Sequence, residues 1–243
     1  MNLKKFHIII LLLAAVLPEL YSQTKVYATG GPEIIFSLAE IDNNGQTGGN
    51  ILRFAPVLNI QAFGNVDFGK HIGLIFGGAI RNVGFIYEYS DPGDGVITTI
   101  KKKYRNYDFG IPLGIKLGVM NKWLLYGGYE IEFPFHYKEK TFIEGTKMDY
   151  KITDWFSART PSYYHSVFVG MQLPYGFSLK FKYYFTEYFN QDYFDGASNS
   201  YPYQNLKSNI WYFSLNFSIF RNNRIMYKEY EENRRKSKKD GFY

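Results

Sequence analysis

Long stretches of the chain alternate between large apolar residues and small or polar ones, with the two-residue period of a β-strand. The clearest case is residues 211–220, WYFSLNFSIF, in which one face carries Trp, Phe, Leu, Phe and Ile. The opposite face carries Tyr, Ser, Asn and Ser. This combination is typical of a barrel wall that has lipid on one side and a narrow, crowded interior on the other.

The same alternation predicts eight strands. Their expected bounds are 32–41, 51–63, 72–89, 104–119, 123–138, 163–173, 177–189 and 209–220. The second, fourth and sixth connections are short, whereas the others are longer and rich in Gly, Asn, Asp, Ser and Lys. Outer-membrane barrels alternate tight periplasmic turns with longer external loops in this way. We therefore predict an all-β fold, an eight-stranded antiparallel up-and-down transmembrane β-barrel with both chain ends on the periplasmic side.

One predicted strand departs from simple alternation. In the third strand the apolar positions change phase, from the even-numbered Leu74, Phe76 and Ile80 to the odd-numbered Val83, Phe85 and Tyr87. A β-bulge near residues 81–82 is the simplest explanation, because one extra residue reverses the face on which later side chains lie.

Alternation alone does not say which face points inward, since a secreted lipocalin-like barrel has the same period with its apolar side inside. Residue size favours the membrane barrel. A solvent-facing surface is normally rich in Lys and Glu, but here the polar faces consist largely of Gly, Ser, Ala and Asn with a few charges of both signs. Small residues suit the lumen of an eight-stranded barrel, which is just wide enough for side chains.

The two ends of the chain differ from its body. Lys4 and Lys5 precede an apolar run over residues 8–17, so residues 1–22 are expected to form a cleaved signal peptide. The run is shorter than the roughly 20 residues of a spanning helix. The barrel domain is expected over residues 23–220 and a basic periplasmic tail over residues 221–243, which hold eight Lys/Arg against four Asp/Glu. The net charge of +6 therefore describes mainly the tail, and nucleic acid is not an expected partner.

Four segments, GPEIIFSLAEI, AIRNVGFIY, FGIPLGIKLG and GGYEIEFPFHYKEK, carry a family resemblance. They resemble the small outer-membrane β-barrel domain proteins of Bacteroidetes-type envelopes, within the OmpA- and OmpX-like class of transmembrane barrels. The resemblance implies a protein of the cell outer membrane that contacts outer-membrane lipid and the barrel-assembly machinery. Such proteins often end at an aromatic residue that closes the last strand. Phe220 would fill that role here, but a charged tail follows it.

Charged residues interrupt the small, polar faces of the predicted strands. The candidate lumenal charge network consists of Arg53, Arg81, Glu130, Glu132, Lys180 and Lys182, and the same faces also carry Glu33, Lys116 and Asp108. A charge inside a low-dielectric wall is costly unless it is paired. Opposite charges at mid-height therefore predict ion pairs that plug the lumen and hold the strands together. A gated path for ions or small solutes is the alternative interpretation.

No motif predicts catalysis, a metal site or a cofactor, so we expect a protein that is not an enzyme. His136 and His165 are expected near the outer rim, on the strands that flank a loop over residues 139–162. Their spacing matches no catalytic triad, and a zinc site would need ligands that the sequence does not place. The run at residues 101–103, KKK, is expected at the end of an external loop, where it would meet acidic lipid headgroups or a specific ligand.

The sequence thus predicts an integral outer-membrane barrel with a structural or binding role at the cell envelope. Two alternatives stay open. One is a narrow channel for ions or small solutes, which a conductance measurement would detect. The other is an accessory component of an envelope secretion machine of the PorT kind, with a periplasmic partner bound through the basic tail.

Overall fold

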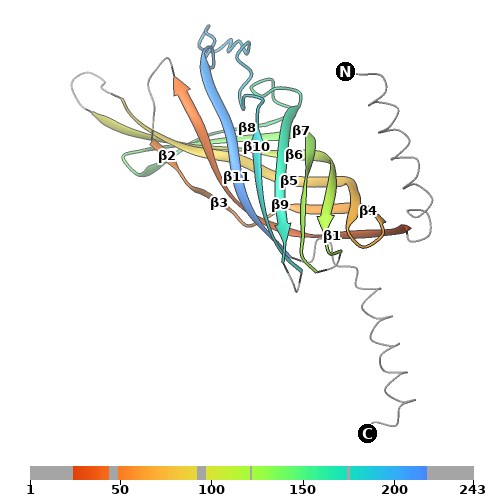
Figure 1. Cartoon of the computed structure of the whole chain (residues 1–243). Helices are drawn as coiled ribbons and strands as arrows, with labels where there is room; N and C mark the ends of the chain where they lie inside the picture. The colour runs from red at the N-terminus through yellow and green to blue at the C-terminus, as the bar shows by residue number, and fades with distance from the viewer. Residues whose placement is uncertain (1–23, 44–48, 92–96, 121, 174–175, 218–243) are drawn as a thin grey trace, which may run out of the picture.

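The chain folds into a closed, antiparallel β-barrel in the computed structural model, which describes residues 24–43, 49–91, 97–120, 122–173 and 176–217 (Figure 1). The strands are β1 (Thr24–Asn43), β2 (Gly49–Ile51), β3 (Arg53–Ala55), β4 (Ile60–Phe68), β5 (Ile72–Asp91), β6 (Thr98–Gly118), β7 (Leu124–Ile143), β8 (Thr146–Trp155), β9 (Tyr164–Gln172), β10 (Phe177–Tyr184) and β11 (Leu206–Phe217). The predicted signal peptide, the predicted periplasmic tail and Phe220 lie outside the described residues.

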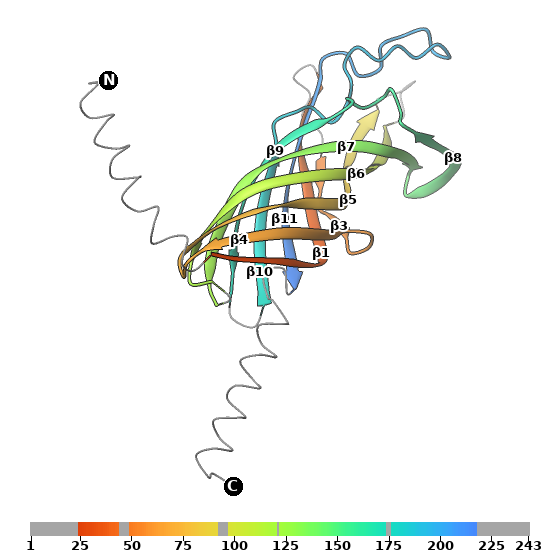
Figure 2. The same ribbon diagram turned by 90° about the vertical axis from the view of Figure 1, so that its right-hand side faces the viewer.

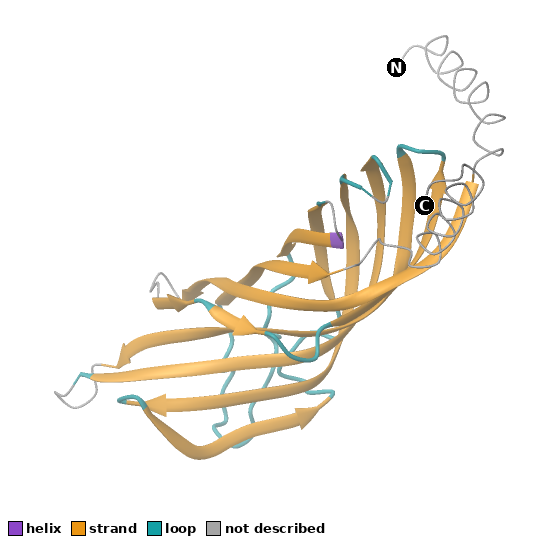
Figure 3. Ribbon diagram, turned by 90° about the horizontal axis from the view of Figure 1, so that it is seen from below, coloured by secondary structure: helices purple, strands orange, loops and turns teal. Residues whose placement is uncertain are grey.

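Eight strands form the ring, in the order β1, β4, β5, β6, β7, β9, β10 and β11, and β11 pairs with β1 to close it. The eight-stranded antiparallel fold that the alternation predicts is therefore confirmed. Three turns join strands at the end of the barrel where β1 begins and β11 ends, and they are short. Figure 3 shows that strand makes up most of the described chain.

The outward face of the barrel is apolar, whereas the inward face carries buried charged and polar residues together with buried aromatic ones. On β6 the outward Leu113 is 61% exposed, whereas the inward Lys116 is 0% exposed. The same contrast separates the outward Phe213 from the inward Ser214 on β11. Such a closed ring with a large apolar exterior satisfies its own backbone hydrogen bonds and suits lipid. Within the described residues, no helix is long and apolar enough to cross a membrane.

Beyond the ring, β5, β6 and β7 continue outward as a sheet, with β2 paired to β5 and β8 paired to β7. Figure 2 shows the β7–β8 hairpin projecting from the barrel. The prediction of a loop over residues 139–162 was wrong for residues 139–155, which form a strand hairpin. β7 runs to Ile143, turns at Glu144–Gly145, both of which have positive φ, and returns as β8. The KKK run lies within β6 rather than in a loop.

The predicted bulge in β5 was also wrong. Pairing with β6 keeps one register from Ile72 to Asp91, and the odd-numbered residues face inward throughout. The apolar residues Val83 and Phe85 are therefore buried inside the barrel instead of facing lipid. The pattern changes phase because the inward residues of β5 themselves change. Near the short turns they are mostly small, with Gly73, Gly77 and Ala79, whereas toward the outer end they include the larger Val83, Phe85 and Tyr87.

The irregularity lies instead between β6 and β7, where the register shifts at Tyr107/Asp108. Phe135 is the extra residue on β7. After it Tyr137 and Glu139 face inward, whereas His136 pairs with the outward Tyr107. A bulge reverses later side chains in this way.

The second predicted strand is broken. β3 ends at Ala55 and β4 begins at Ile60, so part of the ladder to β5 is missing, and β4 continues to Phe68 through the predicted turn at residues 64–71. Side chains replace the missing bonds. Asn59 accepts a hydrogen bond from the backbone N of Asn82 (2.7 Å) and donates one to the carbonyl of Ala55 (2.8 Å).

The seventh predicted strand ends early. β10 stops at Tyr184, five residues before its expected end, and the chain then turns into the barrel mouth. Tyr188 and Phe189 are 1% exposed there, and the Tyr188 backbone N bonds to the carbonyl of Ser208 (3.0 Å). The loop after β10 is thus part of the interior.

The side-chain repair in the broken strand can be tested with Asn59→Ala. We expect the free energy of unfolding to fall by about 2–6 kcal/mol, because two buried backbone groups lose their partner and each such group costs roughly 1–3 kcal/mol. The measurement is urea unfolding of the refolded barrel in lipid vesicles, followed by heat-modifiable gel migration. The control is Gln204→Ala, which removes an exposed amide. Equal unfolding midpoints for Asn59→Ala and the unmodified protein would contradict the repair.

Candidate functional site: the lumen and its outer mouth

Arg81 lies at the centre of the charged cluster in the lumen. It projects inward from β5 and meets three carboxylates that come from β1 and β7. Its Nη2 lies 3.1 Å from Glu130 Oε1 and its Nε lies 3.3 Å from Glu132 Oε1, while Nη1 bonds to Glu33. Its guanidinium can satisfy several acceptors at once because its donors point in fixed directions. Arg81 therefore links strands from opposite parts of the ring.

Two lysines on β10 complete this set. Lys180 Nζ lies 2.7 Å from Glu33 Oε1, and Lys182 Nζ lies 2.6 Å from Glu130 Oε2 while also bonding to Glu132. The Tyr184 hydroxyl donates a 2.6 Å hydrogen bond to the second oxygen of Glu132. We call Glu33, Arg81, Glu130, Glu132, Lys180 and Lys182 the central network; it has three positive and three negative charges, all buried.

Small residues make room for these long side chains. Gly110 lies opposite Glu132 in the β6–β7 pair, and a Cβ there would overlap the Glu130 carboxylate. Asp108 is two residues along β6 from Gly110 and is also buried, but neither of its carboxylate oxygens has a hydrogen-bond partner among the described residues. The glycine-rich inward face thus reflects packing space rather than chain flexibility.

A separate polar cluster lies nearer the end with the short turns. Lys116 Nζ lies 2.6 Å from Asp67 Oδ1 and 2.9 Å from the Asn65 side-chain oxygen. The Tyr27 hydroxyl donates a 2.8 Å hydrogen bond to the other oxygen of Asp67. Lys116 and Asp67 are 0% and 2% exposed, so this cluster excludes solvent from its level of the lumen.

Aromatic rings fill the outer mouth. Phe189 stacks on Tyr203 with ring centroids 4.2 Å apart, and it contacts Tyr104 edge-on at 5.0 Å. Tyr164 stacks on Tyr188 at 6.1 Å and donates a 2.9 Å hydrogen bond to the Tyr188 carbonyl. Such pairs add to the stability that the buried ring area provides. The mouth is therefore closed by the loop after β10 packed against the barrel wall.

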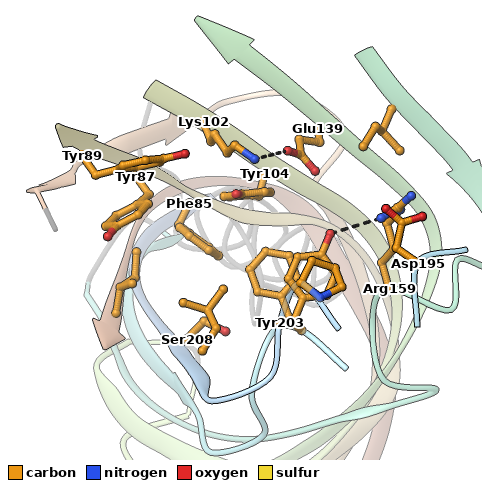
Figure 4. Close-up of a pocket in the computed structure, with 15 residues that line it drawn as sticks. Phe85, Tyr87, Tyr89, Lys102, Tyr104, Glu139, Arg159, Asp195, Tyr203 and Ser208 are labelled. Atoms are coloured by element: carbon orange, nitrogen blue, oxygen red, sulfur yellow. Dashed lines mark hydrogen bonds and ion pairs between the residues drawn. The ribbon is translucent and has the colours of Figure 1, made fainter. Parts of the chain in front are cut away.

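A cavity of about 270 Å³ remains above these rings (Figure 4). Its aromatic walls include Tyr87, Tyr104 and Tyr203. Two polar pairs line it: Lys102 Nζ lies 3.1 Å from Glu139 Oε1, and Arg159 Nη1 donates a 3.4 Å hydrogen bond to the Tyr203 hydroxyl. Burial raises the pKa of Tyr203, and the negative charge of Glu139 raises it further. Both charges of the ion pair and the tyrosine hydroxyl thus border one small space.

The structure brings together five of the six residues that the sequence proposed as a network, and it places Arg53 apart. Arg53 Nη1 donates a 3.0 Å hydrogen bond to the carbonyl of Asn82, and Nη2 bonds to the Asn82 side chain. No ion pair joins Arg53 to a carboxylate within the described residues. It crosses the gap where β3 and β5 do not pair, which makes it part of the repair described above.

Sequence reasoning missed Asp67 and Tyr27. Asp67 fell in a predicted turn, and Tyr27 preceded the first predicted strand. Asp67 lies two residues from the buried Asn65 on β4, and Tyr27 lies two residues from the buried Thr29 on β1. If the predicted strands had been longer, the alternation would have placed both residues on the inward face. The mouth residues Tyr188 and Phe189 carried no such signal, because their burial depends on how a loop folds.

The two rim histidines lie outside the barrel wall. His165 stacks on Phe185 at 5.8 Å and contacts the Tyr129 hydroxyl, and His136 meets Trp155 edge-on at 4.7 Å. They do not face one another or share a carboxylate. Among the described residues, no three His, Cys, Asp or Glu side chains are grouped to hold a metal ion. Both histidines thus lie among outward aromatic rings, a setting that is typical of the membrane–water interface.

A closed eight-stranded ring, an apolar exterior and a lumen filled by paired charges define the fold as that of an outer-membrane β-barrel. No family model and no curated protein matches the chain.

Solved structures with a similar arrangement of strands include Ail, the attachment invasion locus protein of Yersinia pestis. It is 12% identical, with 78% of this chain and 97% of that chain covered and a TM-score of 0.33. The outer membrane protein OprG from Pseudomonas aeruginosa is 10% identical, with 80% and 92% covered and a TM-score of 0.29. At these values the similarities transfer no property to this chain.

The central network can be tested with Lys182→Met, which leaves the carboxylates of Glu130 and Glu132 in excess. We expect a loss of about 3–5 kcal/mol in the free energy of unfolding, because breaking a buried pair strands a charge. Adding Glu132→Gln restores a neutral network, so the double variant should lose less than the sum of the two single variants, by about 0.5–3 kcal/mol.

Urea unfolding of the refolded barrel measures all three variants, with the exposed Lys122→Met as the control for loss of a lysine. Additive losses for Glu132→Gln and Lys182→Met would show that the two side chains do not act as a pair.

Proposed function

We propose that this chain is an integral outer-membrane barrel with a sealed lumen, and that its role at the cell envelope is structural or binding rather than conducting. One observation supports the sealed lumen: the six charges of the central network and the Lys116–Asp67 pair are buried, and each of them has an ion-pair partner. Glu33, Arg81 and Lys182 are at most 1% exposed, so a water-sized sphere does not reach them from either end.

The three levels act in series. The Lys116–Asp67 cluster, the central network and the aromatic mouth would each have to open before an ion could pass. Opening the central level means separating charges in a low-dielectric wall, which costs several kcal/mol for each ion. A barrel of eight strands has little spare width for side chains to swing aside. A narrow channel is therefore the less favoured function.

Binding is expected at the outer end, where the structure offers polar and aromatic surface. The strands that extend beyond the ring and the cavity near Tyr203 both lie there. Surfaces carried on the outer loops of a rigid barrel are free to vary without disturbing the wall.

The sealed lumen is tested by single-channel recording of the refolded mature protein in planar bilayers, beside Glu130→Ala/Glu132→Ala. We expect no discrete openings from the unmodified protein. The double variant empties part of the central level and is expected to conduct.

Heat-modifiable gel migration checks that each sample is folded and inserted. Leu113→Ala, which removes a similar volume from the lipid-facing surface, is the control and should stay silent. Discrete openings from the unmodified protein, altered in the double variant, would make the chain a channel instead.

A further inference from the structure

The outward face of the sheet extension carries positive charges that lie directly opposite one another. Lys103 on β6 pairs with Lys140 on β7, and Lys140 pairs in turn with Lys151 on β8. One step closer to the barrel, Arg105 pairs with Lys138. Residues opposite one another in an antiparallel pair share a face, with Cβ atoms about 4.5–5.5 Å apart.

Like charges in such cross-strand positions destabilise a sheet. Lys147 on β8 adds a further positive charge near this row. None of these six side chains forms an ion pair with a carboxylate within the described residues, although Asp149 lies between Lys147 and Lys151 in the sequence. The neighbouring Lys101 differs because it forms an ion pair, with its Nζ 2.8 Å from Glu88 Oε2. We call Lys103, Arg105, Lys138, Lys140, Lys147 and Lys151 the basic face.

The environment of Lys138 shows the mutual repulsion. It lies on the part of β7 that continues beyond the ring, and its pKa is lowered by slight burial and then by the charges of Arg105, Lys140, Lys151 and Lys147. A group of cations that has no carboxylate partner among the described residues suits a partner that supplies negative charge.

An aromatic group fixes the height of the basic face. Tyr107, Phe135, His136 and Trp155 contact one another on the outward surface just below it, with Phe135 stacked on Trp155 at 6.1 Å. Trp155 is 65% exposed there. Trp and Tyr side chains gather at the membrane–water interface. Arg105 and Lys138 lie two residues further along their strands, which is about 7 Å. The basic face therefore begins at the level of lipid headgroups.

We propose that the basic face binds the phosphate groups of lipids in the outer leaflet around the barrel. This inference rests on the membrane placement proposed above. Phosphate oxygens accept hydrogen bonds from lysine and arginine and bring the negative charge that the face lacks. The projecting β7–β8 hairpin widens the surface beyond the wall, so that several headgroups could lie along one side of it (Figure 2).

The test uses the refolded full chain in zwitterionic micelles. The protein is titrated with lipid A and, separately, with the same lipid stripped of its phosphates, and the thermal unfolding midpoint is measured. We expect phosphorylated lipid A to raise the midpoint. In Lys140→Gln/Lys151→Gln the lipid concentration for half the effect should rise roughly 25-fold, taking about fivefold for each lysine near an anionic surface. The control, Lys70→Gln/Lys122→Gln, removes two exposed charges at the opposite end and should respond as the unmodified protein does.

A second readout separates binding from a structural role. Without lipid, Lys140→Gln/Lys151→Gln should raise the unfolding midpoint, because it removes a repulsive pair. A lower midpoint would overturn the proposal, as would equal stabilisation by the dephosphorylated lipid.

Inorganic phosphate and dextran sulfate distinguish other sources of negative charge. If either one stabilises the protein as well as phosphorylated lipid A does, the face is a site for soluble anions and the lipid proposal fails. A chain that gives no heat-modifiable folded form in micelles would contradict the membrane barrel itself. A folded chain that ignores the phosphates would contradict only the basic face.

Discussion

A charge enclosed in a narrow membrane barrel has to be neutralised inside the barrel, because neither lipid nor the crowded lumen offers enough water to solvate it. The central network meets this constraint with three carboxylates and three cations drawn from β1, β5, β7 and β10. Arg81 is the residue on which the arrangement depends, since it contacts all three carboxylates, those of Glu33, Glu130 and Glu132. The same contacts hold strands from different parts of the ring in register.

This constraint explains the residues that surround the charges. Gly110 leaves space for the Glu130 carboxylate, and Gly73 leaves space for the Lys116–Asp67 pair. Long charged side chains can fill an eight-stranded lumen only if the residues facing them are small. The contrast between a polar, glycine-rich inner face and a bulky outer face, which is visible in the sequence, is the signature of this packing.

The faces of β6, β10 and β11 could be predicted because each strand keeps one alternation from end to end. β5 could not, although its register is regular, because Val83 and Phe85 are apolar and yet point inward. An apolar residue indicates the lipid face only where the interior is polar, and the interior of the mouth is aromatic. The break at residues 56–59 and the β7–β8 hairpin depend on contacts between distant segments, such as Asn59 with Asn82, which no local pattern reveals.

For the charged residues of the candidate site, too, one property could be predicted from the sequence and another could not. Five of the proposed network residues come together because alternation placed them on inner faces at similar heights. Arg53 also points inward, but its strand, β3, pairs with β1 and not with β5 among the described residues. Its guanidinium crosses that gap and bonds to the backbone and side chain of Asn82. Inward direction can be read from a two-residue period, whereas the identity of the partner depends on strand register.

The positive charges of the central network are neutralised inside the barrel, whereas those of the basic face on its outer surface are not, among the residues that the structure describes. Inside, Lys180 and Lys182 each have a carboxylate within 2.7 Å, and the set is balanced. Outside, at the level above Trp155, Lys103, Lys140 and Lys151 lie side by side across three strands, and no carboxylate among the residues that the structure describes pairs with them. Water and salt screen exposed charges, so an unbalanced row is tolerated there but contributes no stability of its own. A row of this kind has a physical advantage only where negative charge lies next to it, and the headgroup region beside an aromatic band is such a place.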